Sequence, residues 1–323
     1  MLFRSVAADI DNGSNDACGI ASLVASKTSF NCSNVGANTV TLTVTDNNGN
    51  TSTCNSTVTV QDNVAPIALC KNITIQLNSS GNATITAADI NNGSSDACGI
   101  ASLVASKTSF NCSNVGANTV TLTVTDNNGN TSTCNSTVTV QDNVAPVALC
   151  KNITIQLNSS GSATIVAADI DNGSNDACGV ASLSASKTSF NCSNVGANTV
   201  TLTVTDNNGN TSTCNSTVTV QDNVAPVAVC KNITVQLNSS GTASITASQV
   251  DNGSADACGI TMGVSPNSFT CSNVGSNTVV LTVTDSNGNT ATCSSTVTVQ
   301  DNVAPVATCK NITIQLDATG NAS

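Results

Sequence analysis

Cysteine and aspartate are the residue types in this sequence that can do chemistry, and both recur at fixed positions. Sixteen cysteines return four at a time, beginning with Cys18, Cys32, Cys54 and Cys70. Histidine is absent and no C-x-x-C pair occurs, so the cysteines indicate disulfides and not zinc sites. Such a framework belongs in an oxidising compartment. Every acidic residue is Asp, whose oxygens suit a hard cation such as Ca²⁺.

Most catalytic chemistry is excluded by composition. The 323 residues include no His, Glu, Tyr or Trp, whereas general acid-base catalysis and nucleophile activation usually need His, Glu, Tyr or a perturbed Lys. The sequence therefore predicts a protein that is not an enzyme. Its net charge of -11 disfavours nucleic acid and anionic membrane surfaces. No apolar run is long enough to span a bilayer, so no membrane insertion is expected.

One repeat unit accounts for nearly the whole chain. Residues 20–66 recur without a change at 100–146. The later cysteine sets are Cys98, Cys112, Cys134, Cys150, then Cys178, Cys192, Cys214, Cys230, then Cys258, Cys271, Cys293, Cys309. We name the predicted modules repeat 1 (1–64, which lacks its first strand), repeat 2 (65–144), repeat 3 (145–224) and repeat 4 (225–303). Residues 304–323 are the predicted first strand of a following module.

The apolar pattern within a repeat has the period of a β-strand. Val120, Leu122 and Val124 alternate with Thr, which predicts one buried and one Thr-covered face. In repeat 2 we predict strands near 70–77, 83–90, 100–105, 108–112, 118–125 and 133–141, separated by Asn- and Gly-rich turns. The predicted fold class is all-β: tandem immunoglobulin-like antiparallel β-sandwiches in a linear array, stapled by disulfides. Each core has one aromatic residue, from Phe30, Phe110, Phe190 and Phe269.

These residues carry a family resemblance. The segments CKNITIQL, DACGI and SFNCSNVGANTVTLTVTDNNGNTSTCNSTVTVQDNVAP resemble the hyalin-repeat (HYR) family of immunoglobulin-like modules over essentially the whole chain. More closely, they resemble the cysteine-containing version in very large secreted bacterial surface proteins, including gliding adhesins. The resemblance implies extracellular adhesion or spacing, and it implies no shared ligand site.

Four cysteines per repeat allow three pairings, which geometry can rank. Cys98 and Cys112 flank a short strand, turn and strand, so we expect them to pair, together with Cys18–Cys32, Cys178–Cys192 and Cys258–Cys271. Cys70 and Cys134 begin the first and last strands, which run parallel in an immunoglobulin-like sandwich. We therefore favour Cys70–Cys134 over Cys54–Cys70. The same reasoning applies to Cys150, Cys214, Cys230 and Cys293.

This pairing leaves Cys54 and Cys309 without a partner in the chain. One hypothesis is head-to-tail assembly, in which residues 305–317 of one copy complete residues 7–61 of the next and Cys309 bonds Cys54. The alternative is a continuous longer array of which this chain is a part. The expected partner is the protein itself in both cases.

The aspartates predict calcium sites where repeats meet. In repeat 2 we expect Asp89, Asp96 and Asp126 to lie at one pole with Asp62 of the incoming linker. The alternative is that these residues only form turns, as Asp and Asn commonly do. The corresponding residues in the later repeats are Asp142, Asp169, Asp171, Asp176, Asp206, Asp222, Asp251, Asp256 and Asp285.

The predicted function is structural: a repeat segment or subunit of an extracellular fibre or cell-surface adhesin stalk. The alternative function is a multivalent adhesive module that binds a glycan or a protein, displayed on the repeat array for avidity. The aromatic platforms common in glycan recognition are missing, which favours the structural function.

Overall fold

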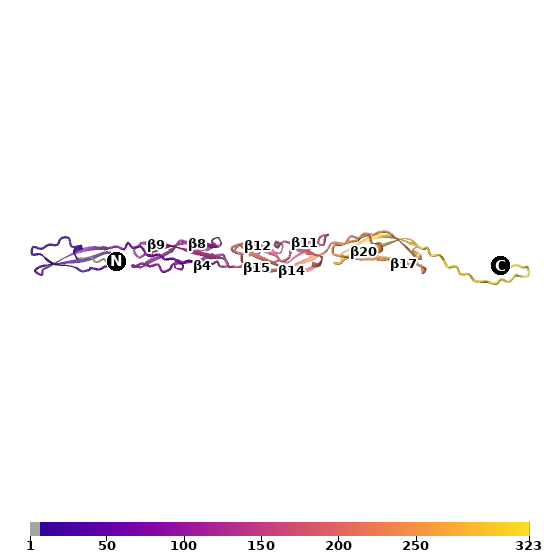
Figure 1. The fold of residues 1–323 in the computed structure, drawn as a ribbon, viewed down its shortest axis with the longest axis horizontal. Coiled ribbons are helices and arrows are strands. Elements are labelled where there is room, and N and C mark those ends of the chain that lie inside the picture. The colour runs from indigo at the N-terminus through magenta and orange to yellow at the C-terminus, as the bar shows by residue number, and fades with distance from the viewer. Residues whose placement is uncertain (1–6, 323) are drawn as a thin grey trace. The chain divides into compact units, whose positions relative to one another are not determined.

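The structure is a computed structural model that describes residues 7–322, so residues 1–6 of repeat 1 and residue 323 lie outside it. The chain divides into two compact units. The first comprises Met1–Pro146 with Asp176–Val180 and Thr205–Asn210, and the second Val147–Asn175, Ala181–Val204 and Thr211–Ser323. Strands dominate both units (Figure 1).

Repeat 2, in the first unit, contains one complete sheet pair. Its elements are β4 (Ile73–Gln76), β5 (Asn82–Thr84), α2 (Ala87–Ile90), β6 (Ile100–Ala105), β7 (Ser109–Asn111), η2 (Cys112–Asn114), β8 (Gly116–Asp126) and β9 (Thr131–Gln141). A four-stranded sheet has the order β4-β9-β8-β6, and β5 pairs with β7 in a second, small sheet. Strand β4 runs parallel to β9, and the other pairs are antiparallel.

The core of repeat 2 lies on one face of the four-stranded sheet. Val120, Leu122 and Val124 of β8 are fully buried and pack with Phe110 and Leu77. The threonines between them face outward, as the alternation predicts. Each such aliphatic side chain contributes about 1.5–3 kcal/mol when it is buried. The single aromatic residue of the repeat is therefore a core residue.

The predicted strand 83–90 is wrong in its second half. Strand β5 ends at Thr84, and residues 87–90 form the helical turn α2. The Asp89 carboxylate accepts hydrogen bonds from the backbone N–H and the hydroxyl of Thr86, which closes this turn. The turn places Ile90 in the core. A local side-chain hydrogen bond thus overrides the strand pattern.

Within residues 7–64, repeat 1 forms a three-stranded sheet of order β1-β2-β3, and no described strand runs parallel beside β3. Its elements are α1 (Ala7–Ile10), β1 (Ile20–Ala25), η1 (Cys32–Asn34), β2 (Gly36–Asp46) and β3 (Thr51–Val60). Val58 and Val60 of β3 are half-buried, whereas the corresponding Val138 and Val140 are buried. The open edge of β3 explains this difference.

Repeats 3 and 4 have the same topology as repeat 2. Repeat 3 contributes β10 (Ile153–Gln156), β11 (Ser162–Thr164), α3 (Ala167–Ile170), β12 (Val180–Ala185), β13 (Ser189–Asn191), η3 (Cys192–Asn194), β14 (Gly196–Asp206) and β15 (Thr211–Gln221). Repeat 4 contributes β16 (Ile233–Gln236), β17 (Thr242–Ser244), α4 (Ala247–Val250), β18 (Ile260–Ser265), β19 (Ser268–Thr270), η4 (Cys271–Asn273), β20 (Gly275–Asp285) and β21 (Thr290–Gln300). The sheet orders are β10-β15-β14-β12 and β16-β21-β20-β18, with β11-β13 and β17-β19 as the small sheets. These sheets confirm the all-β immunoglobulin-like prediction.

The last described segment, residues 301–322, forms no strand or helix and is exposed throughout. It is the yellow end of the ribbon (Figure 1). Among the described helices, none has the length and apolar character that a bilayer crossing requires.

Candidate functional site at the junctions between repeats

One class of disulfide lies inside each complete repeat. Cys70 bonds Cys134 with a Cα–Cα distance of 5.8 Å, because β9 carries Cys134 beside the segment that leads into its parallel neighbour β4. The sequence favoured this pairing. The equivalent bonds are Cys150–Cys214 and Cys230–Cys293.

A second class joins successive repeats, and here the expected pairing is wrong. Cys98 bonds Cys32 of the preceding repeat, and Cys112 bonds Cys178 of the following one. Within the second unit, Cys192 and Cys258 form the same bond. None of the predicted pairs Cys18–Cys32, Cys98–Cys112, Cys178–Cys192 and Cys258–Cys271 forms, and Cys18 and Cys271 remain free thiols.

Strand pairing explains why Cys98 cannot reach Cys112. The strands between them do not form a hairpin, because β6 pairs with β8 and β7 pairs with β5. Asn127, just after β8, donates a hydrogen bond from its side chain to the Cys98 carbonyl, whereas Cys112 lies just before β8 begins. The two cysteines are therefore separated by the length of an eleven-residue strand, roughly 35 Å. That distance far exceeds the reach of a disulfide.

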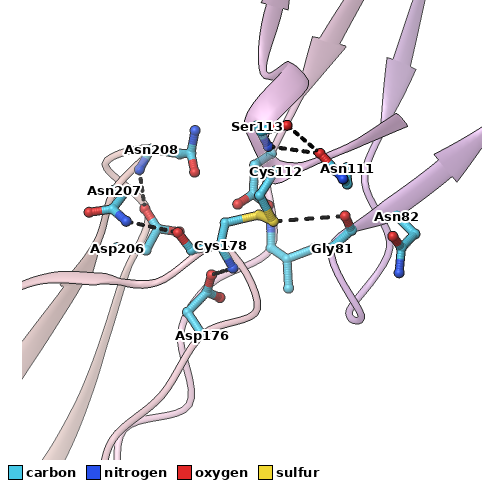
Figure 2. Close-up of a disulfide and its surroundings, with 12 residues drawn as sticks. Gly81, Asn82, Asn111, Cys112, Ser113, Asp176, Cys178, Asp206, Asn207 and Asn208 are labelled. Atoms are coloured by element: carbon cyan, nitrogen blue, oxygen red, sulfur yellow. Dashed lines mark hydrogen bonds between the residues drawn. A yellow bond between two sulfur atoms is a disulfide. The ribbon is translucent and has the colours of Figure 1, made fainter. Parts of the chain in front are cut away.

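The bond between Cys112 and Cys178 is packed against a tight turn of repeat 2 (Figure 2). Gly81, with a φ of +72°, lies in this turn, and its carbonyl oxygen is 3.8 Å from the Cys112 sulfur. On the other side, the Asp176 carboxylate accepts a hydrogen bond of 2.7 Å from the Cys178 N–H. Both ends of the disulfide are thus held by local backbone structure.

Four cysteines of the described chain are free thiols, all of them exposed: Cys18, Cys54, Cys271 and Cys309. Cys18 of repeat 1 corresponds to Cys98, and Cys271 of repeat 4 corresponds to Cys32, so both are at positions that form the bonds between repeats. Cys54 and Cys309 occupy the two positions that bond within a repeat. The free thiols therefore form two complementary sets.

A pair of carboxylates lies beside each disulfide that joins repeats. Asp142, which ends repeat 2, and Asp176 of repeat 3 present ligand atoms that lie, with the Cys178 sulfur, within 4.8 Å of one another. Asp62 with Asp96 and Asp222 with Asp256 form the same arrangement. Each of the three predicted groups of aspartates thus has only two of its carboxylates together in the structure.

The predicted ligand Asp126 closes the turn between β8 and β9 instead. Its carboxylate accepts hydrogen bonds from the N–H groups of Asn128 and Asn130 and from the Asn130 side chain, each 2.8 Å long. Burial raises the pKa of Asp126, but these hydrogen bonds outweigh it and the pKa lies below its ordinary value. Asp206 and Asp285 do the same in their own repeats.

The turn held by Asp126 also touches the linker from the preceding repeat. The Asn130 side chain donates to the Asp62 carbonyl at 3.0 Å. Asn210 donates in the same way to the carbonyls of Asp142 and Val144, and Asn289 to that of Asp222. The Asp126-type residues therefore help to build the junction without joining the carboxylate pair.

The carboxylates of the remaining predicted ligands accept hydrogen bonds within their own turns. Hydrogen bonds from Thr86 lower the pKa of Asp89, which lies in the turn α2. Asp171 and Asp251 accept from Ser174 and Ser254, and these bonds lower the pKa of each carboxyl. Asp169 accepts from the Val166 N–H. The structure does not bring these four residues to the carboxylate pairs.

The first junction, between repeats 1 and 2, contains a cavity. A cavity of about 380 Å³ is lined there by Phe30, Val35, Val60 and Asp62 together with the Cys32–Cys98 disulfide. The equivalent space in repeat 2 contains Leu77, which packs in the core with Phe110 and Val140. Among residues 7–64, no strand pairs with the outer edge of β3, so the described part of repeat 1 offers no side chain in the place of Leu77.

The disulfides between repeats were missed for an identifiable reason. Near-identical repeats offer each cysteine an equivalent partner at several sequence distances, and the prediction took the nearest. One signal was present: the spacing from Cys32 to Cys98 is 66 residues and is kept in all three bonds of this class. The spacing from Cys258 to Cys271 is one residue shorter than that from Cys98 to Cys112.

Comparisons with known proteins agree with this architecture. Residues 146–223 match the family model described as a bacterial Ig-like domain. Hyalin of Strongylocentrotus purpuratus is 34% identical over an alignment of 259 residues, which covers 76% of this chain and 21% of hyalin, so the chain spans about a fifth of that relative.

Two solved structures resemble the chain at low identity. They are PcdhgB3 EC1-4 (11% identity, 83% of each chain, TM-score 0.32) and the sidekick-1 immunoglobulin domains 1-5 (9% identity, 84% of this chain and 68% of that one, TM-score 0.33). The family match, the hyalin relationship and the recurring sheets together establish the chain as a tandem array of immunoglobulin-like repeat modules.

Proposed function

We propose that this chain is a structural, non-enzymatic segment of an extracellular fibre or cell-surface stalk. The alternation of disulfides carries the proposal. Cys150–Cys214 closes repeat 3, while Cys112–Cys178 and Cys192–Cys258 tie that repeat to both neighbours. Each junction thus has a covalent connection besides the peptide linker, so a cut or strained linker does not separate the repeats. Disulfides at this density persist in an oxidising, extracellular setting.

The finer part of the proposal is that copies of the chain join head to tail by strand addition. In repeats 2 to 4 the strand beside the C-terminal strand is followed directly by a buried leucine, Leu77, Leu157 or Leu237, each 3% exposed. The counterpart near the C-terminus is Leu316, which is 68% exposed. A second copy offers the site that fits this side chain, the cavity beside Phe30 and Val60.

Strand addition also places matching polar groups. Ile73 and Ile75 pair with Val138 and Val140 in the parallel register, and the Ser136 hydroxyl donates to the Lys71 carbonyl. The chain has the counterparts for the added strand in Ile312, Ile314 and Lys310, and those for the receiving strand in Val58, Val60 and Ser56. No strand among the described residues pairs with β3 on that side, which makes its backbone a template for a further strand.

The free thiols complete the joint. By the pattern of the internal bonds, Cys309 of one copy pairs with Cys54 of the next, and Cys271 with Cys18. Each bond forms when two thiols lose two protons and two electrons, and oxidised glutathione accepts them to give two molecules of glutathione. The joint between copies then carries the same two classes of disulfide as the junctions within the chain.

Non-reducing electrophoresis of the intact chain in a glutathione redox buffer tests the proposal. We expect a ladder with steps of 32.1 kDa and, by mass spectrometry, peptides that link Cys54 to Cys309 and Cys18 to Cys271. The Cys54→Ser/Cys18→Ser variant should stay monomeric on the gel. A wild-type chain that keeps four free thiols under these conditions, or links them in other combinations, would rule out this joint.

A further inference from the structure

We propose that the carboxylate pairs between repeats are binding sites for a divalent cation, with Ca²⁺ as the fitting ion. The best-defined sites are Asp142 with Asp176 in the first unit and Asp222 with Asp256 in the second. In each site one carboxylate belongs to the end of a repeat and the other to a loop of the next. A bound ion would therefore link two repeats.

The first observation is a buried carboxylate oxygen without a partner. Asp142 is 6% exposed and Asp222 is 7% exposed. Oδ1 of Asp142 accepts a hydrogen bond of 3.1 Å from the Val144 N–H, but Oδ2 is buried and accepts none. Asp222 has the same arrangement with Val224. A buried anionic oxygen without a partner is costly unless a cation compensates it.

The second observation is that each of these carboxylates lies beside another carboxylate, which has the same charge. Asp176 lies in the same 4.8 Å group as Asp142, and its Oδ1 is oriented by the Cys178 N–H. Two carboxylates at this separation repel each other, and a divalent cation between them reverses the sign of the interaction. The lysines of this region face elsewhere: Lys107 lies over the Phe110 ring, and Lys151 acts on Asp171.

The ligand chemistry selects a hard cation. The Cys178 sulfur belongs to the disulfide with Cys112, so it is not available as the thiolate that a soft metal requires. The carboxylates of Asp142 and Asp176 supply oxygen ligands, and Ca²⁺ accepts six to eight oxygens in flexible geometry, with carbonyls and water completing the shell. The carboxylates that close turns, such as Asp206, already have hydrogen bonds to both oxygens and offer no such site.

Calcium titration by calorimetry of the intact, chelator-treated chain is the direct test. The test variant is Asp142→Asn/Asp222→Asn, in which the Asn carbonyl can keep the bond to the Val144 or Val224 N–H while the charge is lost. We expect the wild type to bind two more equivalents of Ca²⁺ than this variant. The matched control is Asp171→Asn, because repeat 2 has Asn91 at that position with the same hydrogen bond to the following Ser N–H. This control should bind as the wild type does.

Thermal unfolding gives a second readout that separates a cation site from a structural carboxylate. Calcium should raise the Tm of the wild type and of Asp171→Asn by the same amount, and raise that of the double variant, which keeps only the Asp62–Asp96 pair, by less. In chelator the double variant should be at least as stable as the wild type, because it lacks the buried unpaired charges. Equal calcium binding by the wild type and the double variant, or a wild type that binds none, overturns the proposal. Neither result affects the head-to-tail joint, which is tested through its cysteines.

Discussion

Gly81 packs directly against Cys112, so that a Cβ atom on Gly81 would lie 2.7 Å from the Cys112 sulfur and 3.2 Å from the Cβ of Ala177. Ala177 is the neighbour of Cys178 in the next repeat. Gly161 stands in the same relation to Cys192 and Ala257. The turn of one repeat and the loop of the next therefore share a single packing site around the disulfide, and a side chain on the turn has no room there.

Replacing Gly81 by Ala should destabilise the junction between repeats 2 and 3. The matched control is Gly93→Ala, since Gly93 has a φ of +81° but would place its Cβ in open space. Both variants lose about 1–2 kcal/mol from the left-handed backbone conformation. Only Gly81→Ala also clashes, so its Tm should fall further and Cys112–Cys178 should be reduced faster by a thiol reductant. Equal effects from the two variants would contradict the contact.

Removing one disulfide of each class should give different results. Cys150→Ser/Cys214→Ser opens a loop inside repeat 3 and should lower its stability by about 4 kcal/mol, a figure set by loop length and model-dependent. Cys112→Ser/Cys178→Ser leaves the Cys150–Cys214 bond intact and removes the covalent tie between repeats. Here a protease cut in the linker near Val144 should release two fragments on a non-reducing gel. The wild type cut at that site should stay in one band.

Leu316→Asp should prevent assembly of the chain with itself. The side chain is the counterpart of buried Leu77, and a carboxylate would be costly to bury beside Phe30. Thr313→Asp is the control, because the corresponding Thr74 is exposed in the paired strand. Light scattering with the four free cysteines replaced by Ser isolates the non-covalent contact. Association that survives Leu316→Asp would exclude strand addition in this register.

Acid should destabilise the turns that Asp126, Asp206 and Asp285 close. Burial raises the pKa of each of these carboxyls, but the hydrogen bonds outweigh it and hold the folded-state pKa below its ordinary value of 3.8. The stability that they contribute is present above pH 3.8 and is lost as the pH falls through the folded-state pKa. The urea midpoint should therefore be constant from pH 7 to 5 and fall below pH 4.

Asp126→Asn provides the check on this assignment. The Asn side chain would place an amide N–H₂ against the donating Asn130 side chain, so the variant should be less stable at pH 7. Because it has no proton to gain at this position, its further loss on acidification should be smaller than that of the wild type. An equal loss would place the acid sensitivity elsewhere.

The alternation of Val and Thr was sufficient to predict β8 and β9, because a period of two allows only one face to be buried. The same pattern was misleading at 87–90, where Asp89 and Thr86 close a helical turn through a bond three residues apart. The parallel pairing of β4 with β9 followed from the immunoglobulin-like topology and placed Cys70 against Cys134.

The carboxylate sites were predicted only in outline. The structure brings Asp62 and Asp96 together and places the turn of Asp126 against the same linker, whereas Asp89, which was predicted to join them, closes the turn α2 instead. Which of them keep a free oxygen depends on hydrogen bonds from residues such as Asn130, and these depend on turn geometry. The sequence could not distinguish the closing aspartate from the paired ones.

The sequence by itself determined the repeat, the strand pattern, the single-aromatic cores and the disulfide character of the cysteines, because these follow from residue types and their periodicity. Only the tertiary structure decided that Cys98 bonds Cys32 and not Cys112. The physical reason is that Cys98 and Cys112, although only 14 residues apart in the sequence, lie at opposite ends of the eleven-residue strand β8. The partner within reach is then supplied by the adjacent repeat.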